Sequence, residues 1–481
     1  MRHPVVRPLA AALLAAASGC ASTPPVPPAT TALRDLQALV AESAPDRDPS
    51  TVDLLLAPDF AYLEARGADA IPSLLRAVET VDRVLGPEAG LRFRVGGATL
   101  FPATPGSADD RRLLWEARLR LARGGCDAIA AFTGQRCGDR AGAAEPNLRL
   151  LLCADSSDPE RNLLHEACHF FGAQDYARGH PGYGLPTVMS YDSDLPRTLD
   201  LDEPNLARIR SRKGRLPAAV PDPLALALES RLQELPAGAG AALLGGFLAA
   251  EIRSEQASGL APAERFARLR PGDPVASWIE GECRRVLKQG DDAAALLLLA
   301  LEGIAAKEVP DGLDRHAALE ASRLAVDGTD GLAPLMPAAE KALERVDSAF
   351  PRDPEVLDLR ASLRARAGDR AAAERLYDAA IDADPLAVYP WRHLAALGRS
   401  CGDERPWLEG WRGALAADPL DPVLAVRWVE DSLDAFPAAL ARPGVREEAA
   451  AALDAAERDF PGWTVPAALR ARLFPGDGGG E

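Results

Sequence analysis

Residues 162–175 read Asn-Leu-Leu-His-Glu-Ala-Cys-His-Phe-Phe-Gly-Ala-Gln-Asp, and the rest of the chain is best understood outward from them. His165 and His169 are four residues apart, so on a helix both imidazoles lie on one face, one turn apart. Glu166 follows the first histidine directly. Neutral imidazoles are good zinc ligands, and a neighbouring carboxylate can take a proton from water at the metal. The stretch therefore predicts a zinc centre on a helix.

The flanking sequence supports the helix. Residues 157–160, Ser-Asp-Pro-Glu, have the form of a capping box with proline in the first turn. We expect the helix to end near Gly172, because glycine tolerates the left-handed conformation that turns a chain off a helix. Apolar faces are supplied by Leu163, Leu164, Ala167, Phe170 and Phe171.

Two residues compete for the position of third ligand. Asp175 lies three residues beyond Gly172, where the chain could return to the metal, and this spacing favours it. His180 is the alternative, although its Gly-His-Pro-Gly surroundings have the composition of a loop.

The run His-Glu-x-x-His-x-x-Gly-x-x-Asp, followed by Thr-Val-Met-Ser-Tyr at residues 187–191, resembles the metzincin zinc peptidases. Their usual third ligand is histidine, and aspartate resembles the snapalysin variant. The resemblance implies that Met189 forms a tight turn beneath the metal. It also implies that Tyr191 contacts the metal or the transition-state oxyanion, although a tyrosine that only packs beneath the site is an equal alternative.

The resemblance further implies the reaction. His165, His169 and Asp175 would hold Zn²⁺, and Glu166 would be the general base that activates water against a peptide bond of a peptide or protein substrate. An adamalysin-like order of strands and helices would surround this site, with an edge strand at residues 138–146 that aligns substrate and a closing helix at 202–213.

Residues 50–214 alternate between strand and helix patterns, which predicts an α/β domain with a mixed, mostly parallel sheet. Cys126 and Cys137 bracket one of the strands and form the favoured disulfide pair. The expected strands are 51–56, 91–95, 128–132 and 148–152, and the expected helices before the histidine pair are 70–85 and 109–123.

Beyond a proline-rich linker at residues 215–223, the sequence predicts helices alone, in a region at 224–337 and in repeats at 338–481. Pro351, Pro385 and Pro419 lie 34 residues apart, and small and aromatic residues recur at fixed offsets between them. This resembles the tetratricopeptide repeat, with a generic array of helical hairpins as the alternative. Such an array could bind a protein partner.

The first residues predict export. A basic start and a short apolar run end at Ala-Ser-Gly-Cys, residues 17–20, which resembles the lipobox of bacterial lipoproteins. We therefore expect a signal peptide at 1–19, a lipid on Cys20 and a proline-rich tether at 20–49, with an ordinary secretory signal and a chance cysteine as the alternative. A lipid anchor would place the protein at a membrane of the cell envelope, periplasmic or surface-exposed.

Composition narrows the choice of function. The formal net charge of −17 repels phosphate backbones and argues against nucleic acid as a partner. The sequence contains no glycine-rich phosphate loop, no Gly-x-Ser-x-Gly elbow and no Cys-x-x-Cys pair. His316 and His393 fall in helical sequence and are interpreted as structural. Two hypotheses remain, a zinc peptidase and a catalytically silent lipoprotein that acts as a scaffold through its helical repeats.

Overall fold

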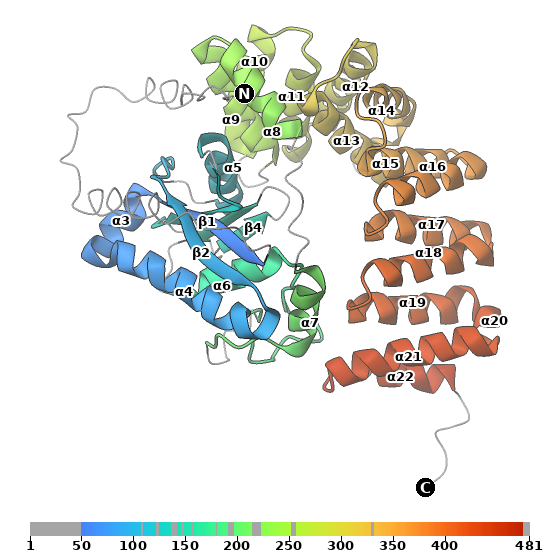
Figure 1. Cartoon of the computed structure of the whole chain (residues 1–481). Helices are drawn as coiled ribbons and strands as arrows, with labels where there is room; N and C mark the ends of the chain where they lie inside the picture. The colour runs from blue at the N-terminus through green and yellow to red at the C-terminus, as the bar shows by residue number, and fades with distance from the viewer. Residues whose placement is uncertain are drawn as a thin grey trace, which may run out of the picture. The chain divides into compact units, whose positions relative to one another are not determined.

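The chain forms two compact units, residues 1–252 and 253–481, of which the first is an α/β domain and the second is all-helical (Figure 1). The computed structural model describes residues 50–106, 109–121, 125–135, 142–145, 149–154, 158–178, 180–190, 197–213, 223–251, 256–328 and 331–474. Cys20 and the expected signal peptide and tether lie outside these residues, as does Cys137 of the expected disulfide. Within the described residues, no helix is long and apolar enough to cross a membrane.

The first unit is built on a five-stranded sheet with the strand order β2-β1-β3-β5-β4. Strands β2, β1, β3 and β5 are mutually parallel, whereas β4 runs antiparallel to β5 at one edge. The sheet is therefore mixed and mostly parallel, as the alternating sequence predicts. Its strands are β1 (Thr51–Pro58), β2 (Arg92–Ala98), β3 (Ala128–Thr133), β4 (Gly142–Glu145) and β5 (Leu150–Ala154).

Helices cover both faces of this sheet. Leu54 and Leu56 of β1 belong to the apolar cluster that contains α4 and α6, while Leu55 and Ala57 belong to the cluster that contains α5. This alternation is the two-residue period of a strand that is buried on both faces. The helices of the unit are α3 (Phe60–Arg66), α4 (Ala70–Ala89), α5 (Asp110–Arg120), α6 (Pro159–His169), α7 (Glu203–Arg212), α8 (Pro223–Glu234) and α9 (Ala237–Glu251).

Helices α8 and α9 belong to the first unit, and the linker expected at 215–223 stays a prediction. The ring of Trp115 on α5 meets Phe247 on α9 edge to face, with centroids 5.1 Å apart. Pro223 starts α8 rather than ending a linker, and residues 214–222 lie outside the described part of the chain. The sequence pattern marks where strands stop, but packing decides which helices stay with the sheet.

The second unit is a succession of antiparallel helical hairpins. Helices α14, α16 and α18 begin at residues 336, 370 and 404, and α15, α17 and α19 begin at 354, 388 and 422. Both series advance by 34 residues, so the repeat read from the prolines is a repeat of structure. The helices are α10 (Gln256–Leu269), α11 (Pro274–Val286), α12 (Gly290–Ala306), α13 (Gly312–Asp327), α14 (Met336–Ala349), α15 (Pro354–Arg366), α16 (Arg370–Ala383), α17 (Val388–Cys401), α18 (Glu404–Ala417), α19 (Pro422–Ala435), α20 (Pro437–Leu440), α21 (Pro443–Asp459) and α22 (Thr464–Leu473).

Small residues bring paired helices close together. A Cβ at Gly410 of α18 would lie 2.5 Å from the backbone nitrogen of Ala395 on α17, and a Cβ at Gly398 of α17 would lie 2.4 Å from that of Trp407. Side chains at these two glycines would force the helices apart. Gly402, with a φ of +66°, ends α17 in the left-handed conformation that allows the hairpin to turn.

Candidate metal centre

The helix that carries the histidine pair is α6, and its start is capped by Asp158. The carboxylate of Asp158 accepts a hydrogen bond from the amide of Arg161 at 3.0 Å, and Pro159 occupies the first turn. The cap therefore falls one residue later than the capping box expected from Ser157, which lies outside the described residues. His165 and Glu166 are buried, with only 6% and 4% of their surfaces exposed.

The end of α6 turns sharply at Gly172. Its φ of +78° is left-handed, its amide donates to the His169 carbonyl at 2.9 Å, and the Ala173 amide donates to the Cys168 carbonyl at 3.2 Å. A Cβ at Gly172 would also lie 1.8 Å from Nη1 of Arg212 on α7. The backbone conformation therefore favours glycine here, and a larger residue would also displace the Arg212 side chain.

The turn brings Asp175 back to the histidines. Its Oδ1 lies 3.2 Å from Nε2 of His165 and 3.2 Å from Nε2 of His169, and the two Nε2 atoms are 3.3 Å apart. Tetrahedral zinc with ligands at about 2.0–2.1 Å would hold those ligands about 3.3–3.4 Å from one another. The three atoms thus have the spacing of a zinc ligand set.

Glu166 lies outside this triangle. Its Oε1 is 4.0 Å from Nε2 of His165, although it is close enough to belong with the histidines to a group of possible ligand atoms within 4.8 Å of one another. A carboxylate at this distance is placed beside a metal position rather than in its ligand triangle.

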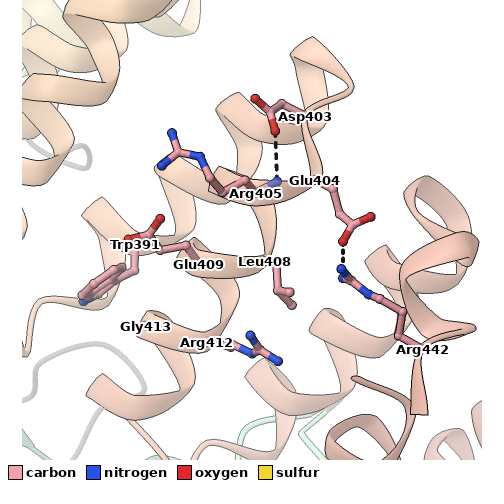
Figure 2. A pocket seen from close by; sticks show the side chains of 9 residues that line it. All are labelled: Trp391, Asp403, Glu404, Arg405, Leu408, Glu409, Arg412, Gly413 and Arg442. Carbon is pink, nitrogen blue, oxygen red and sulfur yellow. Dashed lines mark hydrogen bonds and ion pairs between the residues drawn. The ribbon is translucent and has the colours of Figure 1, made fainter. Parts of the chain in front are cut away.

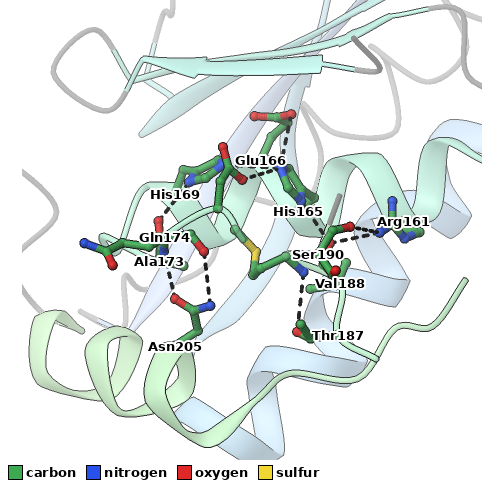
Figure 3. A network of polar contacts seen from close by, with 12 residues as sticks. Arg161, His165, Glu166, His169, Ala173, Gln174, Thr187, Val188, Ser190 and Asn205 are labelled. Carbon is green, nitrogen blue, oxygen red and sulfur yellow. Dashed lines mark hydrogen bonds and ion pairs between the residues drawn. The ribbon is translucent and has the colours of Figure 1, made fainter. Parts of the chain in front are cut away.

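Backbone carbonyls fix the tautomers of both histidines. The Nδ1–H of His165 donates to the Val188 carbonyl at 3.0 Å, and the Nδ1–H of His169 donates to the Ala173 carbonyl at 2.9 Å (Figure 3). A carbonyl can only accept, so each ring must carry hydrogen on Nδ1. This leaves both Nε2 atoms facing the site, and metal-binding histidines typically have their other ring nitrogen held by a hydrogen bond in this way. The donor set therefore fits zinc.

Charge in the site is shared between His169 and Asp175. Burial lowers the pKa of His169, but the hydrogen bond and charge of Asp175 outweigh it and raise that pKa to about 9. Burial likewise raises the pKa of Asp175, but the imidazoles of His165 and His169 beside its carboxylate hold that pKa well below its usual range. At neutral pH a proton therefore lies between a cationic His169 and the Asp175 carboxylate.

The Glu166 carboxylate lies against edge strand β4. A Cβ added at Gly142 would be 2.6 Å from Oε1 of Glu166 and 2.6 Å from the Leu152 carbonyl. Burial raises the pKa of Glu166, which makes its carboxylate a better proton acceptor than an exposed one. The Glu166 carboxylate and the antiparallel strand β4 thus come together at Gly142.

Met189 lies in a buried turn that is joined to the ligand loop. The Ser190 amide donates to the Thr187 carbonyl at 3.1 Å and closes the turn, and the Tyr176 amide donates to the Met189 carbonyl at 2.9 Å. Met189 itself has no exposed surface. The structure therefore places this turn next to Asp175 in the fold. Tyr191 lies outside the described residues, so its two interpretations stay open.

His180, the alternative ligand, faces other groups. Its ring stacks on Tyr176 with centroids 4.5 Å apart, and its Nδ1 accepts a hydrogen bond from the Gly182 amide at 3.0 Å. Of the two candidates, the structure brings Asp175 to the histidine pair.

Arg161 and Asn205 also support the site, and the local sequence motifs do not include them. Arg161 on α6 donates through Nη2 to the Val188 carbonyl at 3.1 Å and to the Ser190 carbonyl at 3.3 Å, so it holds the turn that orients His165 (Figure 3). Arg161 lies four residues before His165, so helical spacing alone could have indicated that the two side chains are neighbours. Asn205 on α7 joins its side chain to the Gln174 backbone, and no local pattern indicates that contact.

The second unit contains a separate pocket of about 660 Å³ around helix α18 (Figure 2). Acidic and basic side chains line it in equal number, and the apolar part is Trp391 and Leu408. Arg442 pairs with Glu404, and Arg412 pairs with Glu448 at 2.7 Å. The charges largely neutralise one another, so the pocket shows no preference for a charged ligand.

Comparisons with known proteins leave the site to be judged on its geometry. No family model matches the chain, and no curated protein matches it. A solved structure described as "Structure of a chaperone-substrate complex" aligns with 34% of this chain and 34% of its own length, at 14% identity and a TM-score of 0.28. A similarity this weak carries no argument about fold or function.

Proposed function

We propose that the chain is a zinc-dependent metalloendopeptidase of metzincin type. The observation that carries the proposal is the triangle of His165 Nε2, His169 Nε2 and Asp175 Oδ1, with edges of 3.2–3.3 Å and both tautomers fixed. The resemblance of residues 165–175 and 187–191 to the metzincin motifs supports the same reaction class.

Different residues of the chain would bind the metal and transfer the proton. His165, His169 and Asp175 would hold zinc, which supplies a Lewis acid that polarises a peptide carbonyl and makes nearby water more acidic. Glu166, buried and beside this triangle, would accept the proton of the attacking water and later deliver it to the leaving amine.

Edge strand β4 would align the substrate. Among the described strands it pairs with β5 alone, so its other side would offer backbone groups to an extended peptide. Because a side chain at Gly142 of β4 would meet the Glu166 carboxylate, a peptide added along β4 would run past the proposed proton acceptor.

The deciding experiment compares wild type with Glu166→Gln. Glutamine matches the size of glutamate but accepts no proton, so hydrolysis of a peptide library should fall by about 10²- to 10⁴-fold while one zinc per chain stays bound. Equal activity of the two proteins would exclude Glu166 as the base. Equal inertness of both would favour the alternative, a scaffold that acts through its repeats.

A second comparison identifies the third ligand. Asp175→Ala should weaken zinc retention itself, whereas His180→Ala should leave it unchanged, because His180 is engaged with Tyr176 and Gly182. The opposite result would move the ligand assignment to His180 and leave the peptidase proposal standing.

The location of the enzyme is part of the proposal. A lipid on Cys20 would hold the catalytic unit at the membrane of the cell envelope, where protein substrates are found. Mass spectrometry of the mature N-terminus tests this, since an unmodified terminus at another residue would contradict it.

A further inference from the structure

The loop that carries Asp175 is held from outside by one buried side chain of helix α7. Asn205 has 1% of its surface exposed. Its Oδ1 accepts from the Gln174 amide at 2.7 Å, and its Nδ2 donates to the Gln174 carbonyl at 3.2 Å. The side-chain amide of Asn205 thus bonds to both the N–H and the C=O of Gln174, as a residue on a neighbouring β-strand would. These two bonds fix the backbone of Gln174. The residue fixed in this way is Gln174, labelled in Figure 3, which directly precedes Asp175 in the chain.

Asp202 fixes the orientation of the Asn205 amide. Its Oδ2 accepts from Nδ2 of Asn205 at 3.1 Å, and its Oδ1 caps α7 by accepting from the Asn205 backbone amide at 2.9 Å. The same carboxylate accepts from the Thr187 hydroxyl at 2.9 Å and from the Tyr176 hydroxyl. The first turn of α7 therefore connects the Asp175 loop with the turn that contains Met189.

We infer that Asn205 is a positioning residue for the metal centre, which sets the place of Asp175 through the Gln174 backbone. This inference rests on the proposed function. It assigns to the Asn205 side chain the role of holding Asp175 in the position that a metal ligand needs. Asp175 needs such support because its side chain is more exposed, at 37%, than those of the histidines at 8% and 19%. The helix fixes the histidines, whereas the aspartate lies on a loop.

The test is a double-mutant cycle on zinc affinity, measured by competition with a chromophoric chelator. Loss of a group that orients a ligand typically weakens metal binding by about 10- to 100-fold, and we expect this of Asn205→Ala. In an Asp175→Ala background the same substitution should have almost no further effect, because the ligand that it positions is gone. The visible spectrum of the Co²⁺-loaded protein should also shift towards that of Asp175→Ala.

Gln174→Ala is the matched control. Both hydrogen bonds that join Asn205 to Gln174 run to the Gln174 backbone, so removal of the glutamine side chain should leave zinc affinity within about twofold of wild type. If Asn205→Ala does not fold, as judged by circular dichroism, Asn205→Asp replaces it. This variant has the same size but loses the Nδ2 donor, and we expect it to weaken zinc binding as well.

The outcomes separate the two ideas. Wild type that binds no zinc overturns the proposed function and the inference together. Wild type that binds zinc, combined with Asn205 variants of unchanged affinity, overturns the inference alone. Equal losses from Asn205→Ala in the wild-type and Asp175→Ala backgrounds also overturn it, because Asn205 would then support the fold in general and not Asp175.

Discussion

Zinc binding should release a proton, and the size of that release follows from the site. With its pKa raised to about 9 by Asp175, His169 is protonated at neutral pH and must lose that proton from Nε2 to bind a metal. The pKa is raised, so the protonated form prevails below pH 9 and competes with zinc there. Between pH 7 and 9 zinc affinity should therefore rise about tenfold per pH unit, with about one proton released per zinc.

The release can be measured by calorimetry on chelator-treated protein in buffers of different ionisation enthalpy. Asp175→Ala removes the carboxylate that raises the pKa of His169. This variant should bind zinc more weakly and yet release less than one proton at pH 8. Tight zinc binding by the wild type without proton release at pH 7 would refute the charge assignment, because His169 would then already be neutral.

Three further substitutions test the surrounding structure. Gly172→Ala should cost about 1–2 kcal/mol of backbone strain and weaken zinc retention, whereas Gly368→Ala, at a similar φ of +81° but in open space, should lower thermal stability alone. Gly142→Ala should displace the Glu166 carboxylate and lower peptide hydrolysis by roughly 10²-fold with zinc still bound, as a paired activity and metal assay would show. Asp431→Ala should cost about 1–3 kcal/mol in denaturant unfolding, because two buried indole N–H groups lose their acceptor.

The sequence predicts the parts of this molecule that depend on local spacing. His165 and His169 share a face because helical geometry places residues four apart together, and Gly172 turns the chain away after that helix because few other residues take its backbone conformation. The 34-residue repeat is likewise a regular spacing. Each of these is contained within a short window of the chain.

Contacts between segments that are distant in the sequence cannot be predicted from local spacing. Asn205 and Gln174 are 31 residues apart, and the Asn205 side chain bonds to the Gln174 backbone. Because any residue has that backbone, the residue types do not indicate the contact. Helices α8 and α9 have helical patterns, but those patterns do not state which core they join. The first turn of α6 was misplaced by one residue because Ser157 and Asp158 are both good caps, and the hydrogen bond to Arg161 decides between them.

The two units are also expected to unfold in different ways. In the hairpin array the most extensive contacts join helices that are next, or next but one, along the chain, such as α15 with α16 and α17 with α18. Disorder could therefore begin at one end and spread by single hairpins, which gives a graded loss of structure under denaturant. In the α/β unit β1 lies between β2 and β3, and α4 packs against α6 and α7 from much later in the chain. Because these contacts join distant segments, we expect the α/β unit to unfold in one cooperative step, and the proposed metal ligands would be lost with it.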